Sequence, residues 1–295
     1  MARQTAPPPV KEPQKITAGD VGDAGALVKA GPTEVGAAID FSQYAGLGNE
    51  NIRTEDKAVP YLVILQKNSP QVDKDHAKYV PGAEVGMILN TVTNEIRKTI
   101  HVVNCHFVPS VVEWVPRESG GGFVAEFQPN APEVLEAAKE NLRNDKGKLI
   151  NRKGNTMVDT ARHFVLDLDE EGSFAQAIIS MTSTQHKPSR QWNSMIENLL
   201  LPRPDGKGKY NPPRFSHIYE LTTKMFPKDQ FTYYNWVLVG KPVPIDNDNM
   251  DLFAAGLAFY QAASKGEVVV GAPPDETGGE GEAEKPGDGR GEKPF

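Results

Sequence analysis

The sequence of 295 residues has a single cysteine and lacks any apolar run long enough to cross a membrane. One cysteine, Cys105, excludes an internal disulfide and a cysteine-based zinc site. A membrane-spanning helix needs about 18 or more mostly apolar residues, so no membrane association is expected. The first fifteen residues lack the apolar segment of a secretory signal. These absences indicate a protein that works in a reducing cytoplasm.

The common enzyme signatures are also absent. The sequence has no G-x-S-x-G elbow, no P-loop and no H-E-x-x-H pair, and its six histidines are scattered. We therefore expect no catalytic residue, no cofactor and no metal site. Asp167 and Asp169 leave one alternative open, a metal-dependent nuclease, although a charged turn between two strands explains them more simply. The acidic run 246–251 begins like a calcium loop but lacks its glycine and late glutamate, so helix capping is the better interpretation.

Basic residues are in the minority overall, with 32 Lys and Arg against 39 Asp and Glu and a net charge of −7. The excess of acid is unevenly distributed. The last 25 residues hold seven acids and three bases, whereas residues 185–228 hold eight bases and three acids. The total charge therefore conceals a basic sector within the body of the protein, and a local basic patch is what counts for binding nucleic acid.

Composition divides the chain into three parts. Residues 1–40 are rich in Ala, Pro, Gly and Val without a sustained hydrophobic period, which predicts a disordered N-terminal arm. Residues 41–270 contain the hydrophobic segments and are predicted to form a single β-rich domain. Residues 271–295 are acidic and rich in glycine, and we expect a disordered tail that ends in Pro294 and Phe295.

The hydrophobic pattern of the body predicts an α+β, β-rich fold. The longest expected strand covers residues 99–115, with a break or bulge at Pro109. Further predictions are strand pairs over 163–183 and 215–240, and helices over 133–143, 189–200 and 251–265. The apolar run 60–67 fits a helix or a strand. Because strands and helices do not alternate strictly, we expect an OB-like barrel or a mixed antiparallel sheet with a few peripheral helices.

The basic sector has the composition of a groove for single-stranded DNA. Cations contact phosphates and release counterions, while aromatic rings stack on unpaired bases. Aromatic residues on strands are more often part of a core, so the stacking role competes with a packing role for each ring. The loop 203–210 combines glycines, cations and Tyr210. The residues predicted to contact DNA are Lys187, Arg190, Trp192, Arg203, Lys207, Lys209, Tyr210 and Arg214, together with Lys148, Arg152 and Lys153 of a second basic turn.

The end of the chain, Glu292-Lys293-Pro294-Phe295, resembles the acidic tip of bacterial single-stranded-DNA-binding proteins. In that family the tip docks onto partner replication enzymes and can lie in the protein's own cationic groove. The resemblance implies the same roles for Pro294 and Phe295. Lys293 interrupts the acids here, which departs from the family pattern.

A second resemblance covers residues 44–125. The segments GLGNE at 46–50, DKAVPYLVILQ at 56–66, SPQV at 69–72 and GMILNTVT at 86–93 are similar to a family of tailed-phage proteins assigned to single-stranded-DNA binding. The resemblance implies a role in phage DNA replication or recombination in the host cytoplasm, with replication or recombination enzymes as partners and homo-oligomers as a further option. It implies no particular site residues. A phage virion or assembly protein is the main alternative.

Overall fold

The computed structural model describes residues 46–53, 56–228 and 231–274. The chain forms two compact units, residues 1–51 and residues 52–295. Of the first unit, residues 46–51 are described, and the Asn49 amide donates to the Gly46 carbonyl at 3.2 Å in a turn. The arm predicted over 1–40 lies outside the described residues, as do residues 275–295 of the predicted tail.

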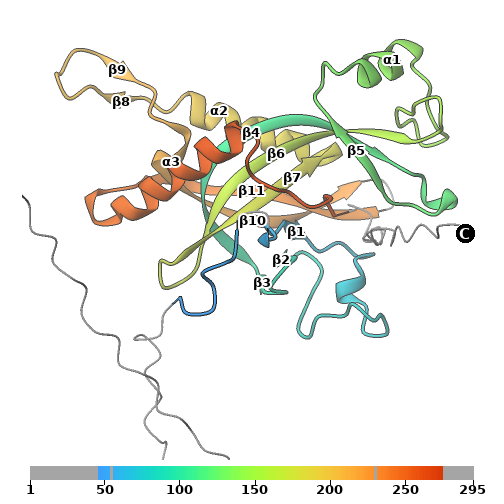
Figure 1. Ribbon diagram of the computed structural model, residues 1–295, viewed down its shortest axis with the longest axis horizontal. Coiled ribbons are helices and arrows are strands. Elements are labelled where there is room, and N and C mark those ends of the chain that lie inside the picture. Colours follow the sequence, from blue (N-terminus) through green and yellow to red (C-terminus); the bar gives the residue numbers. More distant parts are fainter. Residues whose placement is uncertain (1–45, 54–55, 229–230, 275–295) are drawn as a thin grey trace, which may run out of the picture. The chain divides into compact units, whose positions relative to one another are not determined.

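Antiparallel strands and, in the described part of the second unit, three α-helices make up the fold (Figure 1). The strands are β1 (Leu62–Ile64), β2 (Ile88–Asn90), β3 (Ile96–Arg97), β4 (Thr99–Trp114), β5 (Phe123–Phe127), β6 (Thr156–Leu168), β7 (Phe174–Thr182), β8 (Leu201–Pro202), β9 (Lys209–Tyr210), β10 (His217–Lys228) and β11 (Phe231–Pro244). The helices are α1 (Pro132–Glu140), α2 (His186–Glu197) and α3 (Met250–Ser264). No helix in the described ranges is long and apolar enough to span a membrane.

The main sheet is open. Its strands follow the order β11-β10-β4-β6-β7, with β5 paired to the far end of β4. Within the described residues β11 and β7 do not pair with each other, so the sheet does not close into a barrel. Of the two architectures left open by the sequence, the mixed antiparallel sheet is confirmed. A smaller sheet, β1-β2-β3, meets the edge of β7 through a parallel bridge between Tyr61 and Ile178.

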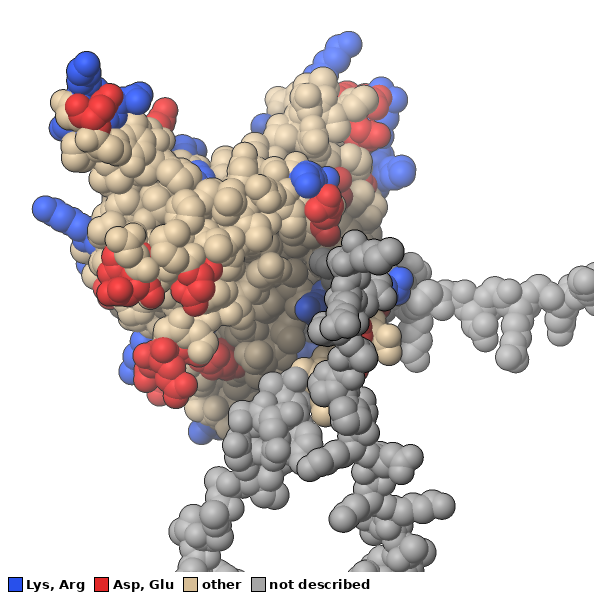
Figure 2. Space-filling model, turned by 60° about the vertical axis from the view of Figure 1, so that its left-hand side comes forward, with Lys and Arg blue, Asp and Glu red and all other residues tan. Residues whose placement is uncertain are grey.

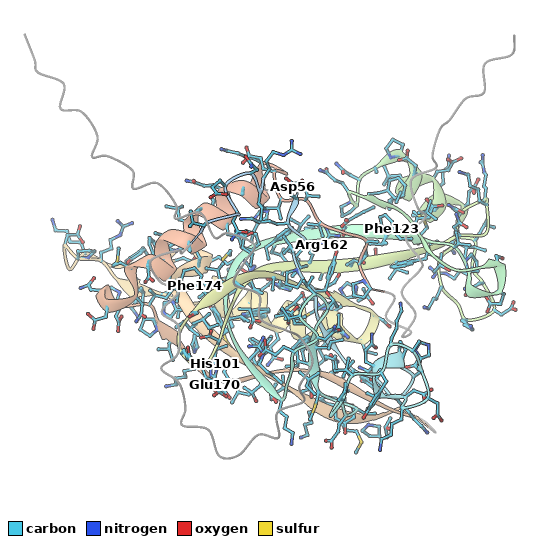
Figure 3. All side chains as sticks on the ribbon, turned by 60° about the horizontal axis from the view of Figure 1, so that its bottom comes forward. Asp56, His101, Phe123, Arg162, Glu170 and Phe174 are labelled. Atoms are coloured by element: carbon cyan, nitrogen blue, oxygen red, sulfur yellow. The ribbon has the colours of Figure 1, made fainter. Side chains whose placement is uncertain are left out.

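Strand β4 is the longest strand and organises the sheet. In Figure 3 His101 lies near one end of β4, and Phe123 of β5, which pairs with Trp114, lies near the other. The pairing of β4 with β6 is irregular between Asn104 and His106 and its pairing with β5 between Glu113 and Trp114, whereas the predicted Pro109 pairs in register with Ala161. Beyond Val103 the strand has no β10 partner, and β5 pairs only from Val111 onward. Pro109 therefore sits where one side of β4 is unpaired, the position at which a missing N–H is tolerated.

The two faces of the sheet are covered by different helices. On one face α3 packs over a core that contains Val103, Cys105, Phe164 and Phe259. On the other, α2 inserts Trp192 and Ile196 among Ile100, Val165 and Tyr219. The bulge at Cys105 shifts the alternation of β4 by one residue, so Phe107 lies on the α2 face. The α2 face carries the candidate functional site.

A close contact joins the small sheet to the β10–β11 hairpin. Gly86 has a φ of +92°, and a Cβ at this position would lie 2.3 Å from the ring of Tyr234. The side-chain amide of Gln66 donates to the Tyr234 carbonyl at 2.9 Å and accepts from its N–H at 3.0 Å, as a neighbouring strand would. The first contact requires glycine, because a side chain at position 86 would clash with the Tyr234 ring.

Candidate nucleic-acid interface

Helix α2 separates its polar and apolar residues cleanly. Ser189, Trp192 and Ile196, at i, i+3 and i+7, are buried against the sheet. Lys187 and Arg190 fall on the opposite face and are exposed. Neither of these two cations has an ion-pair partner among the described residues. The helix therefore presents two available cations on a rigid element.

The β8–β9 hairpin extends directly from the end of α2. Its short strands pair Leu201 with Tyr210 and Pro202 with Lys209. The Asn211 side-chain amide fixes the hairpin base by donating to the carbonyls of Ile196 and Leu199, each at 2.9 Å. The predicted cations Arg203, Lys207 and Lys209 are all exposed and form no ion pair within the described ranges. Tyr210 is 37% exposed, so one ring remains available for contact.

The second basic turn lies beside α1, and ion pairs neutralise part of it. Arg152 contacts both Glu136, at 3.0 Å, and Glu140. Lys146 lies 3.6 Å from Glu118. Lys148 and Lys153 are exposed and have no ion-pair partner in the described part of the chain. Of the three predicted residues here, two are available to a phosphate and Arg152 is engaged with carboxylates.

These two basic regions lie to either side of α2. In Figure 1 the β8–β9 hairpin and α1 project on the same side of the sheet, with α2 between them. Figure 2 shows two projections whose tips carry both blue and red residues. A shallow pocket of about 280 Å³ opens beside α2. It is lined by Phe107, Pro109 and Ser110 of β4, Pro129, Asp159–Ala161 of β6, and His186, Ser189, Arg190 and Asn193 of α2.

A chain of buried polar side chains supports this pocket from below. Ser189 Oγ lies 2.9 Å from Nε2 of His163, and His163 Nδ1 lies 3.0 Å from the Asn104 amide nitrogen. Arg214 donates to Asn104 Oδ1 at 3.3 Å and to Asn193 Oδ1. The Arg214 guanidinium also lies 5.6 Å from the centre of the Phe107 ring. The sequence predicts Arg214 as a cation that contacts DNA. In the structure its guanidinium instead contacts Asn104, Asn193 and Phe107 in the interior of the site.

The hydrogen bonds in this series all point the same way, with each donor on the side of Arg214 and each acceptor on the side of Ser189. Arginine can only donate, so Asn104 Oδ1 accepts and the Asn104 amide nitrogen donates to His163 Nδ1. The His163 proton then resides on Nε2 and is donated to Ser189 Oγ. A catalytic Ser-His pair requires the opposite polarity, with the imidazole accepting from the hydroxyl. Burial, aided by Arg214, also lowers the pKa of His163 well below its usual range. Ser189 is therefore not activated, and its own hydrogen is available for donation.

Trp192 is buried in this structure, contrary to the prediction that it contacts DNA. Its side chain is 0% exposed and stacks on His163 with ring centres 4.7 Å apart. Phe215, Tyr219 and Trp236 of the same sector are buried as well. The packing role therefore prevails for these rings, because each fills the core beneath α2 or α3. A base cannot reach Trp192 from the surface.

The acidic clusters have structural roles. Asp167 is buried and pairs with Arg97, and burial raises its pKa although Arg97 opposes the shift. In the β6–β7 turn, Asp169 accepts hydrogen bonds from the backbone amides of Glu171, at 2.9 Å, and Ser173, at 2.8 Å. Figure 3 shows Glu170 of the same turn at one end of the sheet. Asp246 accepts from the Asp248 amide at 3.2 Å, which is a cap. Within the described ranges no cluster of three His, Cys, Asp or Glu side chains could hold a metal.

Several lining residues were not predicted from the sequence. Phe107 and Ser110 of β4 and His186 and Asn193 of α2 come from two distant segments and carry no motif. Only β4–β6 pairing and the docking of α2 bring them together. The predicted tail residues Pro294 and Phe295 lie outside the described residues, and the structure neither supports nor opposes their role.

The comparisons with known proteins agree with one part of this account. The model of the Pam3 phage gp34-like protein family matches residues 28–269, which is more than half of the chain and includes the whole main sheet, α1–α3 and the pocket. No curated protein and no solved structure matches the chain significantly. The predicted phage origin is therefore confirmed, and the chain belongs to the Pam3 phage gp34-like protein family.

Proposed function

We propose that this phage protein binds single-stranded DNA without sequence preference and supports phage DNA replication or recombination. One observation carries the proposal. Seven exposed cations without ion-pair partners in the described residues lie on α2 and on the two projections beside it, the β8–β9 hairpin and the α1 turn (Figure 1). They are Lys148, Lys153, Lys187, Arg190, Arg203, Lys207 and Lys209.

The arrangement suits a strand rather than a duplex. Cations hold the backbone and release counterions, and this contact is independent of sequence. Unstacked bases need apolar or aromatic surfaces, which Tyr210 and the walls of the pocket supply. In this mechanism the strand runs from the β8–β9 hairpin across α2 toward the α1 turn. Ordering the strand against this surface would melt its secondary structure and present it to other enzymes.

Binding of a short dT oligonucleotide at low salt tests the proposal, followed by fluorescence anisotropy. We expect binding to dT and weaker binding to a duplex of equal length, because base pairs keep their faces hidden from the protein. Replacing Lys67, Lys74 and Lys98, exposed cations in and beside the β1–β3 sheet, by alanine provides a charge-matched control for later variants. Absence of any dT binding at low salt would overturn the proposal and favour an assembly role instead.

A further inference from the structure

Helix α3 is apolar on all sides, although one side faces solvent. Leu252, Gly256 and Phe259 are buried against the sheet. No residue from 252 to 264 is charged, and α3 is the most apolar of the three described helices. A helix that is apolar all round is normally buried all round, in a core or in an interface. The exposed side of α3 therefore indicates an interface.

The outer face of α3 presents large and small apolar side chains to solvent. Met250 is 54% exposed and Leu257 is 37% exposed. Ala254 and Ala258 are exposed one turn apart, and such small residues let a second helix approach closely. The outer faces of α1 and α2 carry charged side chains instead, for example Glu136 on α1. The outer face of α3 thus differs from those of the two other described helices.

The spacing of residues on this face is that of a seam between two helices. Intervals of three and four residues separate Asp251, Ala254, Ala258, Gln261 and Lys265. This is the a/d pattern of a coiled coil, and all five residues are exposed. Because such a seam packs against another helix, the partner should also be helical at the contact.

The outer face of α3 carries opposite charges near its two ends, Asp251 at the start and Lys265 just past the last turn. A second copy of α3 in the antiparallel direction, related by a two-fold axis beside Ala258, brings each Asp251 next to the Lys265 of the other copy. A parallel copy would place like charges together, which is unfavourable. Lys265 lies 3.9 Å from Glu267 of its own chain, but these side chains are 65% and 61% exposed and can rearrange. The face is therefore complementary to itself in one orientation.

The acidic end of the same chain does not match this face. Residues 271–295 hold seven acids and three bases, a net charge of −4. Their one large apolar residue is Phe295. Burying apolar side chains requires an apolar partner surface, which this segment lacks. A second copy of α3 supplies such a surface.

We propose that the protein forms a two-fold dimer in which the outer faces of two antiparallel α3 helices pack together. The inference is independent of the proposed DNA binding. Because α2 and α3 cover opposite faces of the sheet, the dimer leaves both α2 surfaces open. One pair of short helices makes a small interface, so the dimer should dissociate on dilution.

Sedimentation equilibrium of the full chain tests the association. We expect a mass that rises with concentration from that of one chain to that of two. Ala258→Glu should weaken the dimer by at least about tenfold, because it places two carboxylates together at the two-fold axis. Leu135→Glu is the matched control, since Leu135 is a 56% exposed apolar residue of α1 and should not affect the dimer. A monomeric wild-type protein, or a dimer that Ala258→Glu leaves intact, would overturn the inference.

A charge exchange tests the orientation of the two helices. Asp251→Lys and Lys265→Asp should each weaken the dimer several fold, because each brings like charges together twice in the antiparallel pair. The double variant should restore the wild-type dissociation constant, since it exchanges the two signs. A change that only disturbed the folding of α3 would not be repaired in this way. Failure of the double variant to recover would contradict the antiparallel arrangement.

Cysteine cross-linking locates the two-fold axis. The native Cys105 is buried, so an added surface cysteine reacts without competition from it. Ala258→Cys should form a disulfide between two copies on mild oxidation, because the two residues face each other. Ala254→Cys should not, because the antiparallel pair holds its two copies about 12 Å apart along the axis, beyond the Cα separation of about 7 Å that a disulfide tolerates. Cross-linking of both variants, or of neither, would overturn the proposed dimer.

Binding of dT separates this inference from the proposed function. Ala258→Glu should bind a short dT oligonucleotide with the affinity of the wild-type protein, because α3 lies on the face opposite α2. A wild-type dimer that does not bind dT would overturn the proposed function alone. Binding of dT by a wild-type protein that stays monomeric would overturn the dimer alone.

Discussion

The two basic regions beside α2 differ in how many of their cations are paired with acids. The segment 201–210 at the β8–β9 hairpin holds three bases and one acid in ten residues, whereas 132–155 at α1 holds six bases and four acids. On the hairpin, Asp205 accepts from the Lys207 amide at 3.0 Å and leaves the cations without ion pairs in the described part of the chain. At α1 the acids face the bases, and Arg152 contacts two of them.

The number of basic residues in a segment therefore does not show whether that segment can bind phosphate. An exposed ion pair contributes only about 0–1 kcal/mol to stability, but it cancels the charge that a phosphate would meet. The hairpin should therefore supply most of the electrostatic attraction and the α1 turn a smaller share.

The largest effect is expected from the triple variant Arg203→Ala, Lys207→Ala and Lys209→Ala. Removing three phosphate contacts should weaken dT binding at low salt by more than tenfold, because each contact releases a counterion. Anisotropy titrations against the control variant at Lys67, Lys74 and Lys98 measure the difference. Equal affinities for the two triple variants would show that the hairpin is not the main contact.

Tyr210 should rank next. Losing the stacking of one base on an aromatic ring costs about 1–3 kcal/mol of binding free energy. Tyr210→Ala should therefore bind dT at least about fivefold more weakly, whereas Tyr210→Phe should bind it like the wild-type protein. Trp192→Phe is the contrasting aromatic variant, since Trp192 is fully buried. It should lower the melting temperature and leave dT affinity unchanged. The reverse pattern would mean that the buried ring reaches the strand.

The α1 turn should give the smallest effects. Lys148→Ala with Lys153→Ala should weaken dT binding by a few fold, through the loss of up to two phosphate contacts. Arg152→Ala should change affinity by less than about twofold, because its charge already meets Glu136 and Glu140. A loss for Arg152→Ala as large as that of the hairpin variant would remove the distinction between the two regions.

Much of the fold could be predicted from local patterns. The long strand over 99–115, the strand pairs and the three helices appear in the structure within a few residues of their expected ends. The apolar run at 60–67 forms the short strand β1, which the pattern could not decide because apolar runs suit both elements. The bulge after Asn104 has no glycine or proline to mark it, whereas the proline that misled the prediction sits at a half-paired position.

The site was predictable in part. Exposed cations on α2 and the hairpin follow from their spacing and from the turn composition. The same spacing contained the signal against Trp192, since Ser189, Trp192 and Ile196 share the inner face of α2. The engagement of Arg152 and Arg214 could not be predicted, because their partners come from other elements: Glu136 and Glu140 on α1, and Asn104 on β4. The pocket likewise depends on tertiary packing alone.

The salt dependence of dT binding tests the central claim most directly. For single strands, log Kobs should fall with log salt concentration at a slope of about −0.7 per phosphate contact. With five to seven of the exposed cations engaged, we expect a slope of about −4 for the wild-type protein and about −2 for the hairpin triple variant. A steep wild-type slope that the hairpin variant reduces would support the account. A slope near zero, or one that the hairpin variant leaves unchanged, would contradict it.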